Sequence, residues 1–255
     1  MLNFESIGIP IATIKSTDIK KKQPTVYLAS PEESSEIRHG VSEYTLPLDK
    51  HFECAINTDT ERQIVYVSGS SGSGKSYWCR QYIQAYQKAY PKREIYVFSA
   101  ISEDPSIDKI KNLHRIKLTD SFIDDDLTAE DFEKSLTLFD DCDTITNSKL
   151  RKAVMKLQDD ILQTGRHFEV SAVITSHLSC NGKETRLILA EAHIITFFPS
   201  QMSVRGLKYL LESYIGLSKD QIHMVKNLQG RAVSYIRGCP RVLVSDKQVM
   251  TISNK

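Results

Sequence analysis

The sequence predicts an α/β protein with a mostly parallel central sheet flanked by helices. Short β-prone runs without a polar interruption recur along the chain, and such runs are typical of strands buried on both faces of a parallel sheet. Apolar residues at helical spacing lie between several of these runs, as the crossover helices of a parallel sheet require. With 255 residues, of which 40% are hydrophobic and 25% charged, the chain is large enough for one sizeable core.

The first strand and the first helix follow one another closely. IVYVS begins at Ile64 and is followed by a glycine-rich turn. Apolar residues then repeat at helical spacing until Pro91, which cannot continue a helix. These residues are Cys79, Tyr82, Ile83, Tyr86 and Tyr90. The pattern predicts a strand, a loop and a helix.

Four further runs predict the rest of the central sheet. They are EIYVFSA (94–100), LTLFDD (136–141), VSAVITSH (170–177) and AHIITFF (192–198). A helix with one apolar face precedes the third of these runs, and Gly165 stands where a C-cap glycine belongs. The acidic insert 101–134 has no clear periodicity, so no element is predicted there.

The two ends of the chain differ in character. Residues 1–60 contain four prolines and polar clusters, which predicts an irregular N-terminal arm with short strands ahead of one main domain, 61–255. Near the other end, one helix is expected to close at Gly216, and Ser218 with Gln221 forms a capping-box signature for another. AVSYIRG, RVLVS and QVMTI are expected to be C-terminal edge strands.

Composition excludes several classes of protein. The chain has 33 basic and 32 acidic residues, so no global positive field holds a polyanion, and any nucleic-acid contact must be local. Five scattered cysteines without a CxxC pair argue against a disulfide framework or a zinc site and favour a reducing compartment. No secretory leader is expected, and no run of about 18 apolar residues predicts a membrane span.

The turn after the first strand carries the most specific motif. GSSGSGKS, from Gly69 to Ser76, fits G-x-x-x-x-G-K-[ST] with a strand before it and a helix after it. Glycines let backbone N–H groups turn toward phosphates, and the helix adds its positive N-terminal end. Lys75 is expected to neutralise the β- and γ-phosphates of ATP, and Ser76 to ligate Mg²⁺. The predicted nucleotide-binding residues are Gly69, Ser70, Ser71, Gly72, Ser73, Gly74, Lys75, Ser76 and Tyr77.

Two acids at the end of the third strand complete the predicted catalytic set. Nucleoside triphosphate hydrolysis needs a carboxylate for Mg²⁺ and usually a second group that orients water. Asp140 ends an apolar strand, as a Walker-B residue does, and Asp141 follows it. A strand, EIYVFSA, intervenes in the sequence between the phosphate loop and these acids. This spacing is typical of the P-loop branch that contains RecA-like motors.

Three segments together resemble the genome-packaging ATPases of large nucleocytoplasmic DNA viruses, the poxvirus-type branch of the FtsK/HerA superfamily. They are VSGSSGSGKS, LTLFDD and TGRHFEVSAVITSH, and the resemblance covers roughly residues 64–243. It implies a RecA-like P-loop ATPase that forms a ring, a pentamer or hexamer, and moves double-stranded viral DNA into a capsid. It also implies a capsid or inner-membrane packaging partner and a location in the virion or the host cytoplasm.

The resemblance also implies roles for single residues. His177, with Ser176 beside it, corresponds to the γ-phosphate sensor, where relatives commonly have glutamine. Arg166 is the candidate arginine finger for a neighbouring subunit, with Arg186 and Arg205 as competitors.

Two further positions of the resemblance leave alternatives open. Asp141 stands where superfamily members often have glutamate, one methylene longer. The segment LSCNGKETR, with Lys183 and Arg186, is either a DNA-contacting pore loop or an ordinary solvated loop.

Other classes of P-loop protein fit the sequence less well. No NKxD-type segment of a GTPase follows a strand, and no ABC signature opens a helix. A small-molecule kinase remains an alternative, although only Lys183 and Arg186 stand where kinases carry an arginine-rich lid. A nucleotide-binding assembly scaffold is a further alternative, which the intact lysine, serine and acid pair disfavour.

Overall fold

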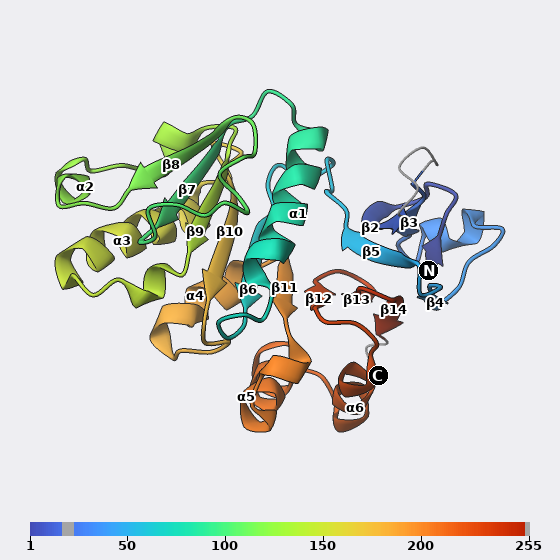
Figure 1. The fold of residues 1–255 in the computed structure, drawn as a ribbon. Coiled ribbons are helices and arrows are strands. Elements are labelled where there is room, and N and C mark those ends of the chain that lie inside the picture. Colours follow the sequence, from blue (N-terminus) through green and yellow to red (C-terminus); the bar gives the residue numbers. More distant parts are fainter. Residues whose placement is uncertain (17–22, 253–255) are drawn as a thin grey trace. The chain divides into compact units, whose positions relative to one another are not determined.

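The computed structural model describes residues 1–16 and 23–252 (Figure 1). The chain forms two compact units. One unit comprises residues 60–193, and the other comprises residues 1–59 and 194–255. Within the described residues, no helix is long and apolar enough to cross a bilayer.

The unit of residues 60–193 is built on parallel strands in the order β6-β10-β9-β7-β8. Their bounds are β6 (Ile64–Ser68), β7 (Ile95–Ser99), β8 (Leu113–Lys117), β9 (Leu136–Asp140) and β10 (Ser171–Ser176). The register pairs Ser68 with Ser176 and Ser99 with Asp140, so the carboxyl ends of the central strands meet at one edge. The parallel sheet that the sequence predicts is confirmed, and β10 separates β6 from β9.

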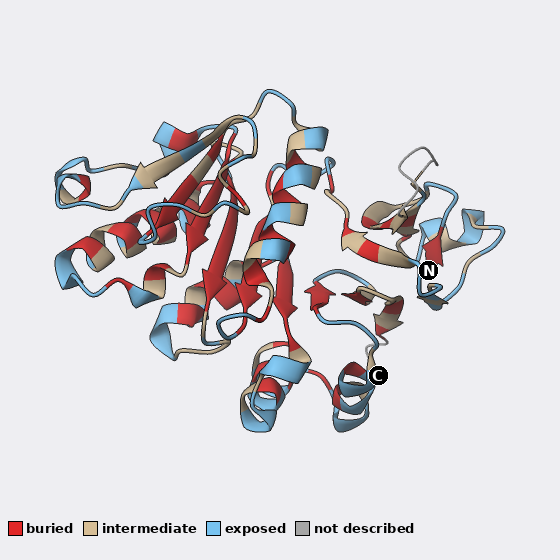
Figure 2. Cartoon of the chain, viewed as in Figure 1, coloured by how far each residue is buried: buried red, intermediate tan, exposed pale blue. Residues whose placement is uncertain are grey.

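Helices lie beside these strands in Figure 1. They are α1 (Lys75–Ala89), α2 (Ser121–Asp124), α3 (Ser148–Thr164) and α4 (Lys183–Glu191), with short 3₁₀ helices at Ala129–Phe132 and Cys142–Thr144. Figure 2 shows β6, β9 and β10 buried throughout, whereas the helices alternate buried and exposed stripes. This contrast follows from the uninterrupted apolar runs of the strands and the 3.6-residue period of the helices.

The structure corrects two expectations in this unit. The insert 101–134, left without an element, contains strand β8, whose sequence LHRIK is only partly buried because the strand lies at the edge of the sheet. The segment expected to be a loop with Lys183 and Arg186 is instead helical from Lys183 onward. Polar residues hid this helix, because lysine, glutamate and arginine form helices well but give no apolar signal in a first turn.

The end of α3 needs glycine for a reason other than the expected one. Gly165 is the C-cap residue, but its φ is −58°, not left-handed. A Cβ atom there would lie 2.4 Å from the Ile161 carbonyl oxygen and 3.2 Å from Nη1 of Arg62. The buried Arg62 guanidinium donates to the carbonyls of Ile161 (2.6 Å) and Leu162 (2.8 Å). The close approach of the Ile161 carbonyl, with Arg62 packed beside it, therefore selects glycine.

The other unit contains two sets of antiparallel strands. One has the order β1-β3-β2-β5 and the other the order β11-β12-β13-β14-β4. The strands are β1 (Leu2–Asn3), β2 (Ile9–Ser16), β3 (Thr25–Leu28), β4 (Glu43–Thr45), β5 (Lys50–Cys54), β11 (Ile194–Phe197), β12 (Val233–Ile236), β13 (Arg241–Ser245) and β14 (Gln248–Ile252).

The helices of this unit follow the predicted capping signals. They are α5 (Val204–Tyr209), a π-helical turn (Leu210–Tyr214), α6 (Lys219–Asn227) and 3₁₀ helices at Glu33–Glu36 and Pro199–Gln201. The Ser218 hydroxyl accepts from the Gln221 amide at 3.3 Å, and the Gln221 side chain accepts from the Ser218 amide at 2.9 Å, as a capping box requires. Gly216 follows the π-helical turn with φ of 75°.

The N-terminal segment and the C-terminal strands lie in one compact unit. β4 pairs with β14, and the Leu46 amide donates to the Lys247 carbonyl at 2.9 Å. The Phe52 amide likewise donates to the Asp246 carbonyl at 2.9 Å. These backbone hydrogen bonds join the two segments. Because the segments are far apart in the sequence, the pairing leaves no local sequence signal. Residues 17–22 of the expected arm lie outside the described residues.

Candidate nucleotide site

The glycine-rich loop connects β6 to α1 and has the backbone that phosphate binding needs. Gly72 and Gly74 have φ of 74° and 112°, conformations that residues with a side chain rarely adopt. The Gly69 amide donates to the Ser176 carbonyl at 3.0 Å, which ties the start of the loop to the end of β10. No side chain among the described residues caps α1, and its first turn carries no acid. Its free N–H groups are therefore suited to bind an anion.

Lys75 contacts two other predicted site residues, Asp141 and His177. Its ammonium is buried and donates to the Gly69 carbonyl at 2.8 Å. The same Nζ lies 3.5 Å from Oδ2 of Asp141 and 3.5 Å from Nδ1 of His177. Nε2 of His177 is in turn 3.1 Å from Oδ2 of Asp141. The loop, the end of β9 and the end of β10 thus bring a cation, an acid and an imidazole together.

Asp140 is the more buried of the two predicted acids. It is 7% exposed, its Oδ1 accepts from Thr175 at 3.0 Å, and its Oδ2 accepts from Ser99 at 3.3 Å. Burial first, and then the nearby Asp141 charge, raise the pKa of the Asp140 carboxyl. A divalent cation would stabilise the charged carboxylate in this setting.

The oxygen donors of Asp140 and Ser76 are of the kind that binds magnesium. Asp140 offers a carboxylate, and Ser76 in the first turn of α1 offers a hydroxyl, both hard oxygen donors of the kind that Mg²⁺ prefers. Among the described residues, no cluster of three or more His, Cys, Asp or Glu side chains could form an all-protein cage.

Asp141 has a left-handed backbone. Its φ is 46°, a conformation in which aspartate is tolerated better than most residues. The Asp141 amide donates to Oγ1 of Thr175 at 2.8 Å, and this same hydroxyl lies 2.9 Å from Oδ1 of Asp141. The turn aims the two consecutive acids differently: Asp140 toward Ser99, and Asp141 toward Lys75 and His177.

Sequence reasoning missed two hydroxyl residues that contact the acids. Ser99 is the last residue of β7 and Thr175 is the penultimate residue of β10, and both are buried. In the sequence, the feature that could have pointed to both residues is a polar side chain at the carboxyl end of a buried strand. The adjacent Ser176 hydroxyl donates to Oδ2 of Asp143 at 2.8 Å.

Arg166 lies apart from this cluster. It precedes β10 and so belongs to the amino-terminal edge of the parallel strands, whereas the glycine-rich loop follows the carboxyl end of β6. On the surface, its guanidinium forms an ion pair with Glu61, and its side chain is 70% exposed. Within one subunit, Arg166 therefore does not reach the site that the loop forms. Tyr77, at the other end of the predicted binding motif, is also exposed.

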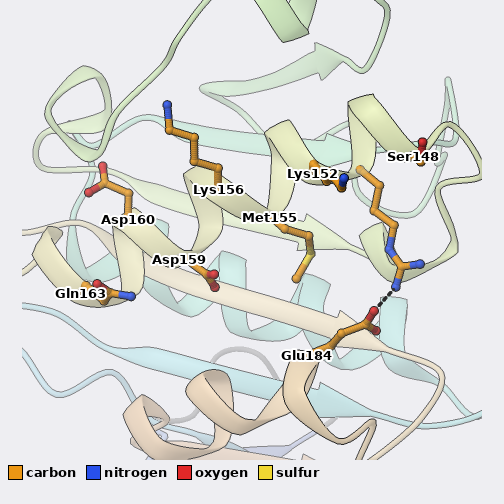
Figure 3. A pocket seen from close by; sticks show the side chains of 9 residues that line it. Ser148, Lys152, Met155, Lys156, Asp159, Asp160, Gln163 and Glu184 are labelled. Carbon is orange, nitrogen blue, oxygen red and sulfur yellow. Dashed lines mark hydrogen bonds and ion pairs between the residues drawn. The ribbon is translucent and has the colours of Figure 1, made fainter.

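An open groove of about 720 Å³ runs along α3 outside the candidate site (Figure 3). Arg151 forms an ion pair with Glu184 of α4 at 2.7 Å. The groove is lined by Ser148, Arg151, Lys152, Met155, Lys156, Asp159, Asp160, Gln163 and Glu184. None of these residues belongs to the predicted nucleotide set, and both signs of charge line the groove, as on a solvated helix face.

Comparisons with known proteins agree with this architecture. No protein-family profile matches the chain. It is 36% identical over 254 residues to the uncharacterized protein V3 of Sputnik virophage, with 98% of each chain covered. Its fold is similar to that of the genome packaging NTPase B204 from Sulfolobus turreted icosahedral virus 2 in complex with AMPPCP, with a TM-score of 0.51. That match has 15% identity and covers 73% of this chain and 99% of B204.

A second fold match is the cytoplasmic domain of the Type VII secretion ATPase EccC from Thermomonospora curvata. Its TM-score is 0.52 at 13% identity, over 86% of this chain and 30% of EccC. These likenesses confirm the predicted α/β fold of P-loop NTPases. The chain therefore belongs to the family of the Sputnik virophage protein V3, and its fold is similar to those of the NTPase B204 and the ATPase EccC.

Proposed function

We propose that this protein is a Mg²⁺-dependent ATPase that moves double-stranded viral DNA into a capsid. The observation that carries the proposal is the convergence of the phosphate-loop Lys75 on Asp141 and His177, each 3.5 Å from its ammonium. Supporting context comes from the virophage relative and from the packaging NTPase with the same fold.

The residues divide the chemistry of ATP hydrolysis among them. The loop amides and Lys75 hold the phosphates, while Ser76 and Asp140 are the residues that would hold Mg²⁺. When bound, Mg²⁺ neutralises charge that develops on the phosphate oxygens. Asp141 orients the water that attacks the γ-phosphorus to give ADP and phosphate, and His177, within 3.1 Å of Asp141, senses the γ-phosphate.

The coupling to DNA requires an oligomer, which we propose to be a pentameric or hexameric ring with a capsid or inner-membrane partner. A formal net charge of +1 suits a motor that holds DNA through few and transient contacts. Lys183 and Arg186, on the first turn of α4 beyond the end of β10, are the proposed DNA-contacting residues.

Steady-state ATP hydrolysis with and without double-stranded DNA tests the proposed function. We expect Mg²⁺-dependent release of phosphate that increases when DNA is added. Transfer of the phosphate to a small acceptor with no effect of DNA would instead identify a kinase. Nucleotide binding without any turnover would identify an assembly scaffold and contradict the proposal.

Mixing subunits tests whether Arg166 acts on a neighbouring site. An arginine finger is worth about 10³- to 10⁵-fold in turnover, so Arg166→Ala rings should be almost inactive. Mixing Arg166→Ala subunits with Lys75→Ala subunits, each inactive alone, should then restore hydrolysis, because the intact nucleotide site of an Arg166→Ala subunit can receive the arginine of a Lys75→Ala neighbour. Glu61→Ala is the matched control, since it breaks the same surface ion pair but keeps the arginine. A mixture as inactive as either variant alone would rule out the trans role.

A further inference from the structure

A single buried hydroxyl lies between the two acids of the candidate site. Thr175 is 2% exposed and stands on β10, the strand between the phosphate-loop strand β6 and the acid-bearing strand β9. Its Oγ1 is 3.0 Å from Oδ1 of Asp140 and 2.9 Å from Oδ1 of Asp141. It also accepts a hydrogen bond from the Asp141 amide at 2.8 Å. All three contacts are made with the acid pair.

The chemistry of a hydroxyl limits what this arrangement can do. A threonine hydroxyl has one proton to donate and two lone pairs to accept with. The Asp141 amide donates to one of these lone pairs. Because there is only one proton, the hydroxyl can donate to only one of the two carboxylates at a time. Threonine is also stiff at χ1, which keeps the oxygen in one place. The hydroxyl therefore fixes both the left-handed turn at Asp141 and the spacing between the two carboxylates.

We propose that Thr175 is a positioning residue that holds Asp140 in the orientation for Mg²⁺ and Asp141 in the orientation for the attacking water. This inference rests on the proposed ATPase function. Ser99 fixes the other oxygen of Asp140, so the carboxylate is held from the strands on both sides of β9. Asp141 has its second oxygen near Lys75 and His177, and Thr175 is its link to Asp140.

Neighbouring residues on the sheet show that this role is specific to position 175. Ser176 points to the other side of the strand, where its hydroxyl donates to Asp143. Thr137 on β9 is equally buried, but its hydroxyl donates to the backbone carbonyl of Ser171 at 3.2 Å. Thr137 is an ordinary strand threonine with no acid partner in the contacts of the described residues, and it supplies a matched control.

The test compares Thr175→Val, Thr175→Ser and Thr137→Val in the full-length protein. Valine keeps the shape but removes the hydroxyl, serine keeps the hydroxyl, and Thr137→Val removes a buried hydroxyl elsewhere in the same sheet. Each variant is measured for ATP affinity with and without Mg²⁺, for ATP hydrolysis and for thermal unfolding. Residues that orient metal ligands typically contribute about 10- to 100-fold to metal affinity or activity.

We expect Thr175→Val to lose about 10- to 100-fold both in hydrolysis and in the Mg²⁺-dependent part of ATP affinity. Its affinity for ATP without Mg²⁺ should stay close to that of the wild type. Thr175→Ser should recover most of the Mg²⁺ effect, and Thr137→Val should retain all of it. If Thr175→Val does not fold, Thr175→Ala is measured in its place with the same expectation.

Three results with the variants would overturn the inference. They are an unchanged Mg²⁺ effect in Thr175→Val, a matching loss in Thr137→Val, and a failure of Thr175→Ser to restore the effect. A wild-type protein whose ATP affinity shows no Mg²⁺ effect would overturn it as well. The proposed function fails separately if the wild type binds ATP with Mg²⁺ but does not hydrolyse it. In that case the effect of Mg²⁺ on ATP affinity can still be measured in each variant, so the role of Thr175 is still tested.

Discussion

Replacing Lys75 with alanine is expected to lower the affinity for ATP by roughly 10- to 100-fold and to abolish hydrolysis. Hydrogen bonds to charged groups contribute about 1.5–3 kcal/mol, and each 1.4 kcal/mol is about tenfold in affinity. Lys75 is buried in the loop and donates to the Gly69 carbonyl at 2.8 Å, so its removal also loosens the phosphate loop itself. Calorimetric or fluorescence titration with ATP gives the affinity, and phosphate release gives the turnover.

Lys88→Ala provides the matched control for this variant. Lys88 lies in the last turn of the same helix and is exposed, so the substitution removes one lysine from α1 without touching the loop. We expect affinity and turnover equal to those of the wild type. A Lys75→Ala protein that binds and hydrolyses ATP as well as Lys88→Ala does would show that the glycine-rich loop is not the nucleotide site.

Asp141→Asn is expected to bind ATP with nearly wild-type affinity and to lose about 10²- to 10⁴-fold in turnover. A side chain that is positioned to accept a proton from the reacting group usually contributes this factor to the rate. Asparagine is the suitable replacement because Asp141 has φ of 46°, and asparagine tolerates this conformation as well as aspartate does. Single-turnover hydrolysis of radiolabelled ATP, alongside equilibrium binding, separates the two effects.

The backbone of Asp141 also dictates the control. Asp126 is a second aspartate with positive φ, 41°, and it lies on the surface paired with Lys156. Asp126→Asn makes the same chemical change in the same backbone conformation and should leave turnover unchanged. If Asp141→Asn turns over ATP at the rate of Asp126→Asn, the carboxylate at position 141 has no part in orienting water.

The strands at the centre of the parallel sheet could be predicted because their burial leaves a strong local signal. β6, β7, β9 and β10 are almost wholly buried and read as uninterrupted apolar runs. The phosphate loop could be predicted from fixed spacing alone, since its chemistry requires glycines, lysine and serine in one order. Lys75, Asp141 and His177 lie together because the loop after β6 and the ends of β9 and β10 meet at one edge of the sheet.

The elements that were missed depend on tertiary position. β8 is an edge strand and so lacks an apolar pattern, and α4 begins with polar residues. The partners of Asp140 could not be found because Ser99 and Thr175 are 41 and 35 residues away from it in the sequence. Only the strand order, with β10 and β7 on the two sides of β9, brings their hydroxyls to its carboxylate.

The packing of Arg62 on the end of α3 has a consequence for how the sheet can respond to a ligand. Arg62 precedes β6, and α3 leads into β10, so one guanidinium fastens the starts of these two neighbouring strands to each other. The amino ends of both strands are thus joined at the edge of the sheet opposite the glycine-rich loop and the two acids. In the motor proposed above, nucleotide binding would therefore displace the carboxyl ends of these strands relative to the end that Arg62 fastens.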